Sequence, residues 1–227
     1  MSDFAELIPG ARKYRAAAVE PLLGSYYPAA RRIAYGLCGD GVVADRVLHR
    51  VFTRALPALS KWRDESDADR WFYHFTVLES RRHATNPGAV ETLLPADGAE
   101  GASTEYVAFL RALRLLPAQQ REAIILTHAE RLNPRYLSVA MDCSAEAAAN
   151  HLRVATQHLE AITGHQLQPL LDGMAQVYKT LSPPRELGQL VIRRRLNRYL
   201  LPGRLRLVMW LIVLVAVAWG VMWWWRR

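Results

Sequence analysis

Apolar residues recur at helical spacing along most of this 227-residue chain. In the N-terminal part, the pattern predicts helices over about 16–37, 43–56 and 67–84. The glycine-rich residues 39–41 stop the first helix, and Pro57 kinks or ends the second. The predicted inward positions are Leu22, Leu23, Tyr26, Ala30, Ile33, Leu37, Leu48, Phe52, Ala55, Leu59, Trp71, Phe75 and Leu78. The pattern therefore predicts an all-α fold.

A second group of helices follows residues 87–103, whose Asn, Pro, Gly, Ala and acidic composition is typical of a linker. Helices are predicted over 104–116 and 118–131, followed by a short helix that Asn133 can cap and a longer one that Ser144 can cap. A short helix, a tight turn and a longer helix form the helix-turn-helix pattern, whose second helix enters the DNA major groove. Its inward positions include Ile124, Ile125, Leu126, Ala129, Leu137, Ala140, Met141, Ala148, Leu152, Ala155 and Leu159.

Two stretches carry a resemblance to a known family. The run LPAQQREAIIL, followed by E-x-L, a short helix, a serine and NHLRVATQHL, resembles the promoter-binding C-terminal domain of sigma-70 family sigma factors, closest to the extracytoplasmic-function group. Upstream, ADRVLHRVFTRAL and the tryptophan-led helix after it resemble the family's N-terminal core-binding domain. Together the two regions cover roughly residues 14 to 163.

The resemblance implies two small helical domains, a region 2-like domain at 1–86 and a region 4-like helix-turn-helix domain at 104–164. It also implies that the chain binds RNA polymerase core and directs it to promoter DNA for transcription initiation. An anti-sigma or other regulatory protein is a further expected partner. No phosphate loop, nucleophile elbow or metal-ligand spacing is visible, so we expect no enzyme activity, no cofactor and no metal.

The expected polymerase-binding residues lie on the helix over 43–56: Asp45, Arg46, His49, Arg50 and Phe52. In the family this helix is acidic, with a glutamine. Here Asp45 keeps its charge, Arg46 and Arg50 reverse it, and His49 replaces the glutamine. Like charges at a docking surface oppose association, so the basic stripe either alters the contact or is a solvated face.

The resemblance also assigns DNA-binding residues. Trp71, Arg81 and Arg82 are expected near the melted promoter element, although the aromatic cluster around Trp71 also suits a core, and a basic pair suits a helix end. On the recognition helix, basic positions of the family are replaced by Ala149, His151 and Val154. The remaining candidates for the upstream element are Asn150, His151, Arg153 and Gln157. Alternatively, this helix-turn-helix is only a scaffold or a protein-contact surface.

The net charge of +8 lies entirely in the C-terminal part, because residues 165–227 contain ten Lys and Arg against two Asp and Glu. Basic helices are expected over 165–206, ending near Pro202. The uncharged run 207–225 matches the thickness of a bilayer and predicts a transmembrane helix. Arginines before this run predict a single-pass protein of the bacterial inner membrane, its N-terminal body in the cytoplasm, with the lipid bilayer as a partner.

Two rival functions remain open at this point. One is a degenerate, membrane-anchored sigma-like protein that regulates or binds other proteins without recognising promoters, which the reversed charges and the alanine-rich recognition helix favour. The other is an enzyme with an unfamiliar site.

Overall fold

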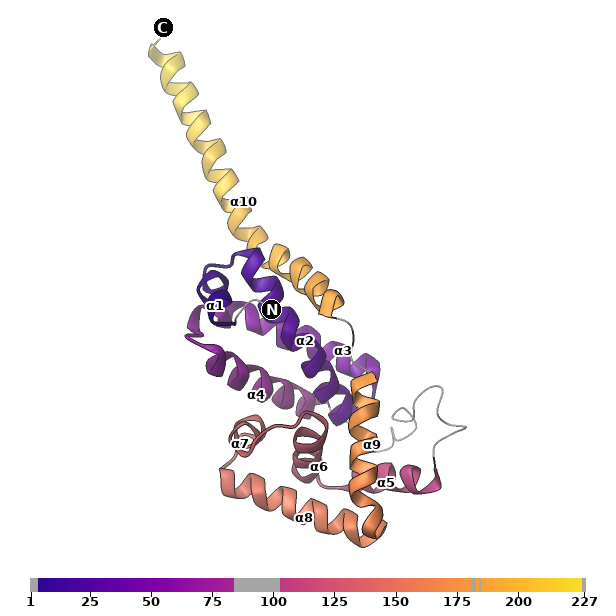
Figure 1. The fold of residues 1–227 in the computed structure, drawn as a ribbon. Helices are drawn as coiled ribbons and strands as arrows, with labels where there is room; N and C mark the ends of the chain where they lie inside the picture. The colour runs from indigo at the N-terminus through magenta and orange to yellow at the C-terminus, as the bar shows by residue number, and fades with distance from the viewer. Residues whose placement is uncertain (1–3, 84–102, 181–182, 184, 226–227) are drawn as a thin grey trace.

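The computed structural model describes residues 4–83, 103–180, 183 and 185–225 (Figure 1). Within these ranges every regular element is a helix, as the apolar periodicity predicts. The expected linker 87–103 lies outside the described residues, apart from Ser103.

The N-terminal domain consists of four α-helices and a short 3-10 turn. Aromatic rings contact one another in its core. Tyr26 is stacked on Phe72 at a centroid distance of 4.2 Å, and Phe52 is tilted against Phe72 at 5.3 Å. The second helix ends because Gly39 adopts a left-handed conformation with φ 73°, and Asp40 then caps the third by accepting from the Val43 amide. The elements are α1 (Phe4–Arg12), α2 (Ala16–Cys38), α3 (Gly41–Ala58), η1 (Leu59–Lys61) and α4 (Glu65–His83).

The predicted inward face of α4 is wrong by about one position. Trp71 and Phe75 are only partly buried, as is Leu78. The helix packs against α2 and α3 on one side and against α7 (Pro134–Met141) on another, so its buried surface is broader than one stripe. Its buried residues are Ala68, Phe72, Thr76, Val77, Glu79 and Ser80.

The C-terminal domain has the predicted helix-turn-helix. α7 is followed by Asp142 in a left-handed conformation with φ 57° and then by α8 (Ala145–Thr163). Asn133 and Ser144 cap the two helices, each accepting a backbone amide three residues on. The predicted helix over 118–131 is instead α6 (Ala118–Ile124) continued by a π-helical turn, η3 (Ile125–Ala129). α5 (Thr104–Leu115) precedes them.

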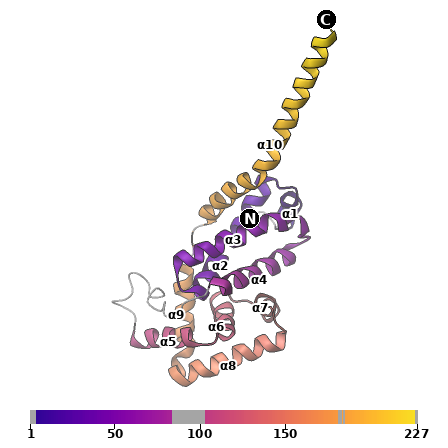
Figure 2. The same cartoon turned by 180° about the vertical axis from the view of Figure 1, so that it is seen from behind.

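After the helix-turn-helix the chain returns to the N-terminal domain. The short turn η4 (Gly164–Gln166) leads into α9 (Leu167–Thr180), where an amphipathic helix is predicted. α10 (Arg185–Trp225) then runs without interruption, so the expected end at Pro202 is wrong. Its first part lies along α2 and α3, and its distal part projects away in a changed direction (Figures 1 and 2). A proline inside a helix is a usual cause of such a bend.

The expected transmembrane helix at 207–225 is not supported, and this corrects the predicted membrane location and bilayer partner. Within the described residues, no helix combines the length and the apolar character that crossing a membrane requires. The apolar run is the distal part of a longer helix, α10, whose first part carries arginines and packs on the N-terminal domain.

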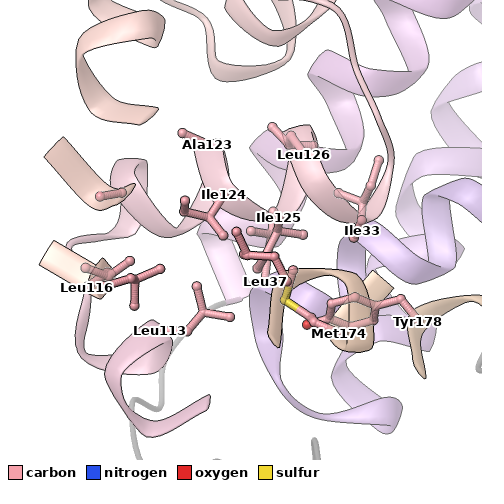
Figure 3. Packing of buried hydrophobic residues seen from close by; sticks show 14 of the residues in the cluster. Ile33, Leu37, Leu113, Leu116, Ala123, Ile124, Ile125, Leu126, Met174 and Tyr178 are labelled. Atoms are coloured by element: carbon pink, nitrogen blue, oxygen red, sulfur yellow. The ribbon is translucent and has the colours of Figure 1, made fainter. Parts of the chain in front are cut away.

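The two domains share a hydrophobic core. Ile33 and Leu37 of α2 pack in one cluster with residues of the helix-turn-helix domain and with Met174 and Tyr178 of α9 (Figure 3). A bidentate ion pair adds to this contact: Arg32 of α2 donates to both carboxylate oxygens of Glu130, at 2.6 and 2.7 Å. The domains are therefore docked on one another in this structure.

Candidate polymerase and nucleic-acid interfaces

Helix α3 exposes most of the residues expected to contact polymerase. Asp45, Arg46, His49 and Arg50 are exposed along its outer side. Phe52 differs, because its side chain is 0% exposed and lies in the core between Tyr27 and Phe72. Phe52 therefore supports the helix from beneath and does not form part of its outer surface.

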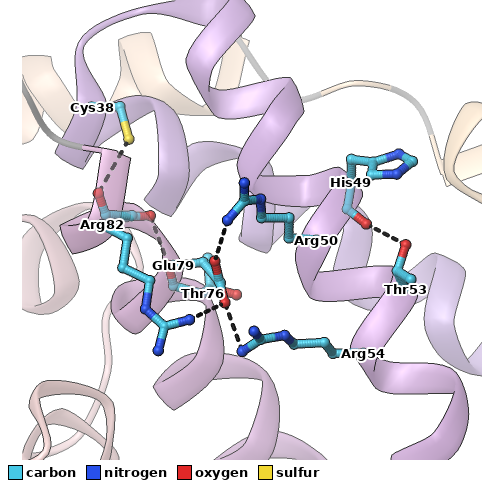
Figure 4. Close-up of polar contacts among 9 residues, drawn as sticks. Cys38, His49, Arg50, Thr53, Arg54, Thr76, Glu79 and Arg82 are labelled. Carbon is cyan, nitrogen blue, oxygen red and sulfur yellow. Dashed lines mark hydrogen bonds and ion pairs between the residues drawn. The ribbon is translucent and has the colours of Figure 1, made fainter.

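Two arginines of α3, Arg50 and Arg54, lie against a carboxylate that sequence reasoning missed. Glu79 of α4 is 0% exposed, and its carboxylate lies 2.8 Å from Arg54 Nη1, 2.8 Å from Arg82 Nη1 and 4.0 Å from Arg50 Nη1 (Figure 4). A buried carboxylate needs compensating charge. Arg54 and Arg82 supply this charge at contact distance, and Arg50 adds a more distant positive charge.

We expect Glu79→Gln to lower the free energy of unfolding by about 2 kcal/mol, because hydrogen bonds to charged groups contribute about 1.5–3 kcal/mol each and the arginines it binds remain partly hydrated. Urea denaturation followed by circular dichroism measures the change. Glu160→Gln, at an exposed position of α8, removes the same charge and is the matched control. Equal midpoints for the two variants would contradict a structural role for Glu79.

The outer side of α3 is also contacted by the first part of α10. Arg195 donates to the carbonyl oxygen of His49 and to Thr53 Oγ1 at 3.1 Å, and its Nη2 lies 2.9 Å from His49 Nδ1. The positive charge of Arg195 is the main cause of a lowered pKa at His49. The neutral imidazole can accept at Nδ1, which matches this geometry.

Trp71 borders a groove between α4 and α7. The ring stacks on Phe75 at a centroid distance of 4.4 Å and tilts against the buried Trp62 at 5.6 Å. The groove has a volume of about 510 Å³ and is also lined by Arg70 and Cys143. Trp71 therefore packs on other aromatic rings, as expected for a core residue, and also lines the groove.

Arg81 and Arg82, expected near melted DNA, are both engaged within the protein. Arg81 donates to the two carboxylate oxygens of Glu122 at 2.8 and 2.7 Å and to the carbonyl oxygen of Met141 at 2.7 Å. The hydrogen bond to Glu122 raises the Arg81 pKa. Arg82 binds Glu79. The guanidinium of Arg81 is thus hydrogen-bonded to the helix-turn-helix domain in the docked arrangement.

On the recognition helix α8, three of the four expected residues form one connected row. Arg153 donates to Asn150 Oδ1 at 2.8 Å and to Gln157 Oε1 at 2.9 Å, and all three side chains are exposed. The fourth, His151, is partly buried on a neighbouring side. A groove of about 520 Å³ runs beside the row and is lined by Ser144, Glu146, Ala147, Ala149, Asn150 and Arg153. Figure 1 places α8 at the end of the molecule opposite α10.

The structure brings together some sets of expected residues and separates others. The α8 row is continuous, whereas the α3 set and the Trp71 region lie on different helices of the N-terminal domain. Sequence reasoning missed Glu79, Glu122 and Glu130, each of which pairs with at least one arginine far along the chain. Their only local signal is an acidic residue on the buried side of an amphipathic helix.

Nothing in the described part of the chain groups His, Cys, Asp and Glu side chains so that three or more could hold a metal ion. Both cysteines are free thiols. Burial raises the pKa of the Cys38 thiol to about 11, which makes it a poor nucleophile at neutral pH.

Comparison with known proteins finds no family model that matches this chain. Over 145 residues, the chain is 26% identical to the ECF RNA polymerase sigma factor EcfG of Rhodopseudomonas palustris (strain TIE-1). The matched region covers 60% of this chain and 79% of that protein. This distant similarity, found in a chain with a helix-turn-helix, supports a relationship with the sigma-70 family.

Proposed function

We propose that this chain is a sigma-like initiation factor that binds RNA polymerase core through α3 and promoter DNA through α8. The observation that carries the proposal is the exposed row of Asn150, Arg153 and Gln157 on the second helix of a helix-turn-helix. In this motif that helix presents side chains to base edges in the major groove. The distant sigma factor similarity supports a role in transcription initiation, and sigma factors are not enzymes.

Arg153 is the residue of the row best suited to read sequence. A guanidinium can donate two parallel hydrogen bonds to the O6 and N7 atoms of guanine, whereas Asn150 and Gln157 suit the N6 and N7 atoms of adenine. All three side chains of the row are exposed in the docked arrangement of the domains. The row therefore stays accessible even while the two domains are docked.

We propose that Arg81 contacts the melted promoter element only when the two domains are apart. Arg81 satisfies Glu122 and the Met141 carbonyl while the domains are docked, so it can reach phosphate only after they separate. Trp71, at the edge of the groove, is the neighbouring aromatic surface on which an unpaired base can stack.

The test is selection of bound duplexes from a random DNA library by the full chain together with core polymerase. We expect an enriched sequence, and we expect Arg153→Ala to reduce discrimination at one base pair of it by about 1–3 kcal/mol. Arg111→Ala removes the same charge from an exposed position of α5 and is the matched control. It should leave base discrimination unchanged.

The outcome separates the proposal from its rival. Core binding without any enriched sequence would favour a sigma-like regulatory protein that does not recognise promoters, for which the internal pairing of Arg81 and Arg82 is the supporting observation. Enrichment that Arg153→Ala leaves unchanged would reject the α8 row as the reading surface.

A further inference from the structure

The first part of α10, residues 185–203, is packed closely on α2. A Cβ atom added to Gly188 would lie 2.7 Å from Tyr27 Cβ, and one added to Gly24 would lie 2.8 Å from Gln189 Cγ. Side chains larger than hydrogen at these two positions would separate the helices. Further along the same side of α10, Ile192 and Leu196 are each 1% exposed within the core of the N-terminal domain. This segment is therefore a built part of the domain surface.

The same segment reaches onto α3 through one arginine. Arg195 binds the His49 carbonyl and Thr53 Oγ1, and its guanidinium lies against the His49 ring. On the α2 side, Arg193 pairs with Glu20 at 3.5 Å. Of the residues expected to meet polymerase, Arg195 contacts His49, and its other contact, Thr53, directly follows Phe52. Figures 1 and 2 both show this part of α10 beside α2 and α3.

We propose that residues 185–203 act as an intramolecular cover over the His49–Thr53 stretch of α3, which Arg195 holds, and so hinder polymerase binding there until the segment leaves it, while Asp45, Arg46 and Arg50 stay exposed. This inference rests on the proposed function, because it assigns regulation to the same α3 surface. A protein whose binding-competent state is only partly populated has its apparent affinity reduced by that fraction. Loosening α10 therefore increases affinity for the polymerase core without altering any residue of α3.

Two glycines of α10 offer a matched pair of variants. Gly188→Leu forces a side chain against Tyr27 and the Gly24 carbonyl, whereas a Cβ on Gly203 meets nothing within 4 Å, so Gly203→Leu adds the same side chain without displacing the helix. A second pair acts at α3: Arg195→Ala removes the contacts to His49 and Thr53, and Arg194→Ala removes an equal charge from an exposed neighbour.

Affinity of each full-length variant for core polymerase is measured by titration, and hydrogen exchange of α10 and α3 amides is followed in the free protein. We expect Gly188→Leu and Arg195→Ala to exchange faster in residues 185–203 and to bind core about tenfold more tightly than Gly203→Leu and Arg194→Ala.

The failure of this inference and that of the proposed function give different results. If all five proteins, the parent included, bind core with equal affinity, the cover is overturned and the polymerase-binding part of the proposed function stands. Tighter binding by the controls as well would overturn it too, because release of α10 would then not be the cause. If none of the five binds core, the proposed function fails and the inference fails with it.

Discussion

Arg81→Ala is expected to lower the free energy of unfolding by about 3 kcal/mol in the absence of any DNA. The substitution leaves the Glu122 side chain, which is 3% exposed, without its cationic partner. Removing one member of a buried ion pair costs about 3–5 kcal/mol because the remaining charge is buried and uncompensated. The lower value applies here because Arg81 itself keeps 29% of its side chain exposed, so water can reach part of the site.

Chemical denaturation of the full chain measures this loss, and hydrogen exchange in α4 and α7 shows where it arises. Arg70→Ala is the control: Arg70 is exposed on the same helix, and surface substitutions of this kind usually change stability by about 0.5 kcal/mol or less. In the Arg81→Ala background, adding Glu122→Gln should recover part of the loss because it removes the orphaned charge. Identical stabilities for Arg81→Ala and Arg70→Ala would show that Arg81 is not part of the interdomain contact.

Phe52→Ala is expected to destabilise the N-terminal domain by about 3–5 kcal/mol, the usual cost of deleting a buried phenyl ring. The ring lies 5.4 Å from Tyr27 and 5.3 Å from Phe72, measured between ring centroids, so its loss leaves a cavity under α3. The midpoint of thermal unfolding measures the effect.

Phe52→Leu keeps most of the buried volume and should cost less than about 1.5 kcal/mol. Because Phe52 is covered, this milder variant should bind polymerase core as the parent does once both are folded. A large loss of core affinity in a stably folded Phe52→Leu protein would mean that Phe52 contacts polymerase directly, as the resemblance alone suggests. The core affinity of Phe52→Leu is compared with that of Arg46→Ala, which changes a side chain on the exposed side of α3.

Local features of the fold could be predicted from the sequence. The inward stripe of α2 and the caps at Asn133 and Ser144 depend on spacings of three or four residues, which the sequence displays directly. The phase of α4 could not be predicted in this way, because the helix is buried against two partners and the pattern of one stripe is incomplete. The fate of the apolar run after residue 207 and the path of the chain through Pro202 were also misjudged from local composition.

The candidate sites follow the same division. The exposed row on α8 could be predicted from helical periodicity, since its members are three and four residues apart. The roles of Arg32 on α2, Arg54 on α3 and Arg81 on α4 could not, because their carboxylate partners are 25 to 98 residues away in the chain. A charged residue on an amphipathic helix has the same sequence signature whether it meets solvent, a partner protein or a distant carboxylate of its own chain.

In the cluster of Arg50, Arg54 and Arg82 around Glu79, we expect ionic strength to affect the repulsion among the arginines and their attraction to Glu79 to different extents. Mobile ions screen interactions between exposed charges over about 8 Å at physiological salt, and they screen buried charges much less. The arginine side chains are 54%, 47% and 47% exposed, whereas the Glu79 side chain is 0% exposed. Added salt therefore weakens the repulsion among the three cations more than their attraction to Glu79. We therefore expect added salt to weaken the junction of α3 and α4 less than it weakens an ion pair between two exposed side chains.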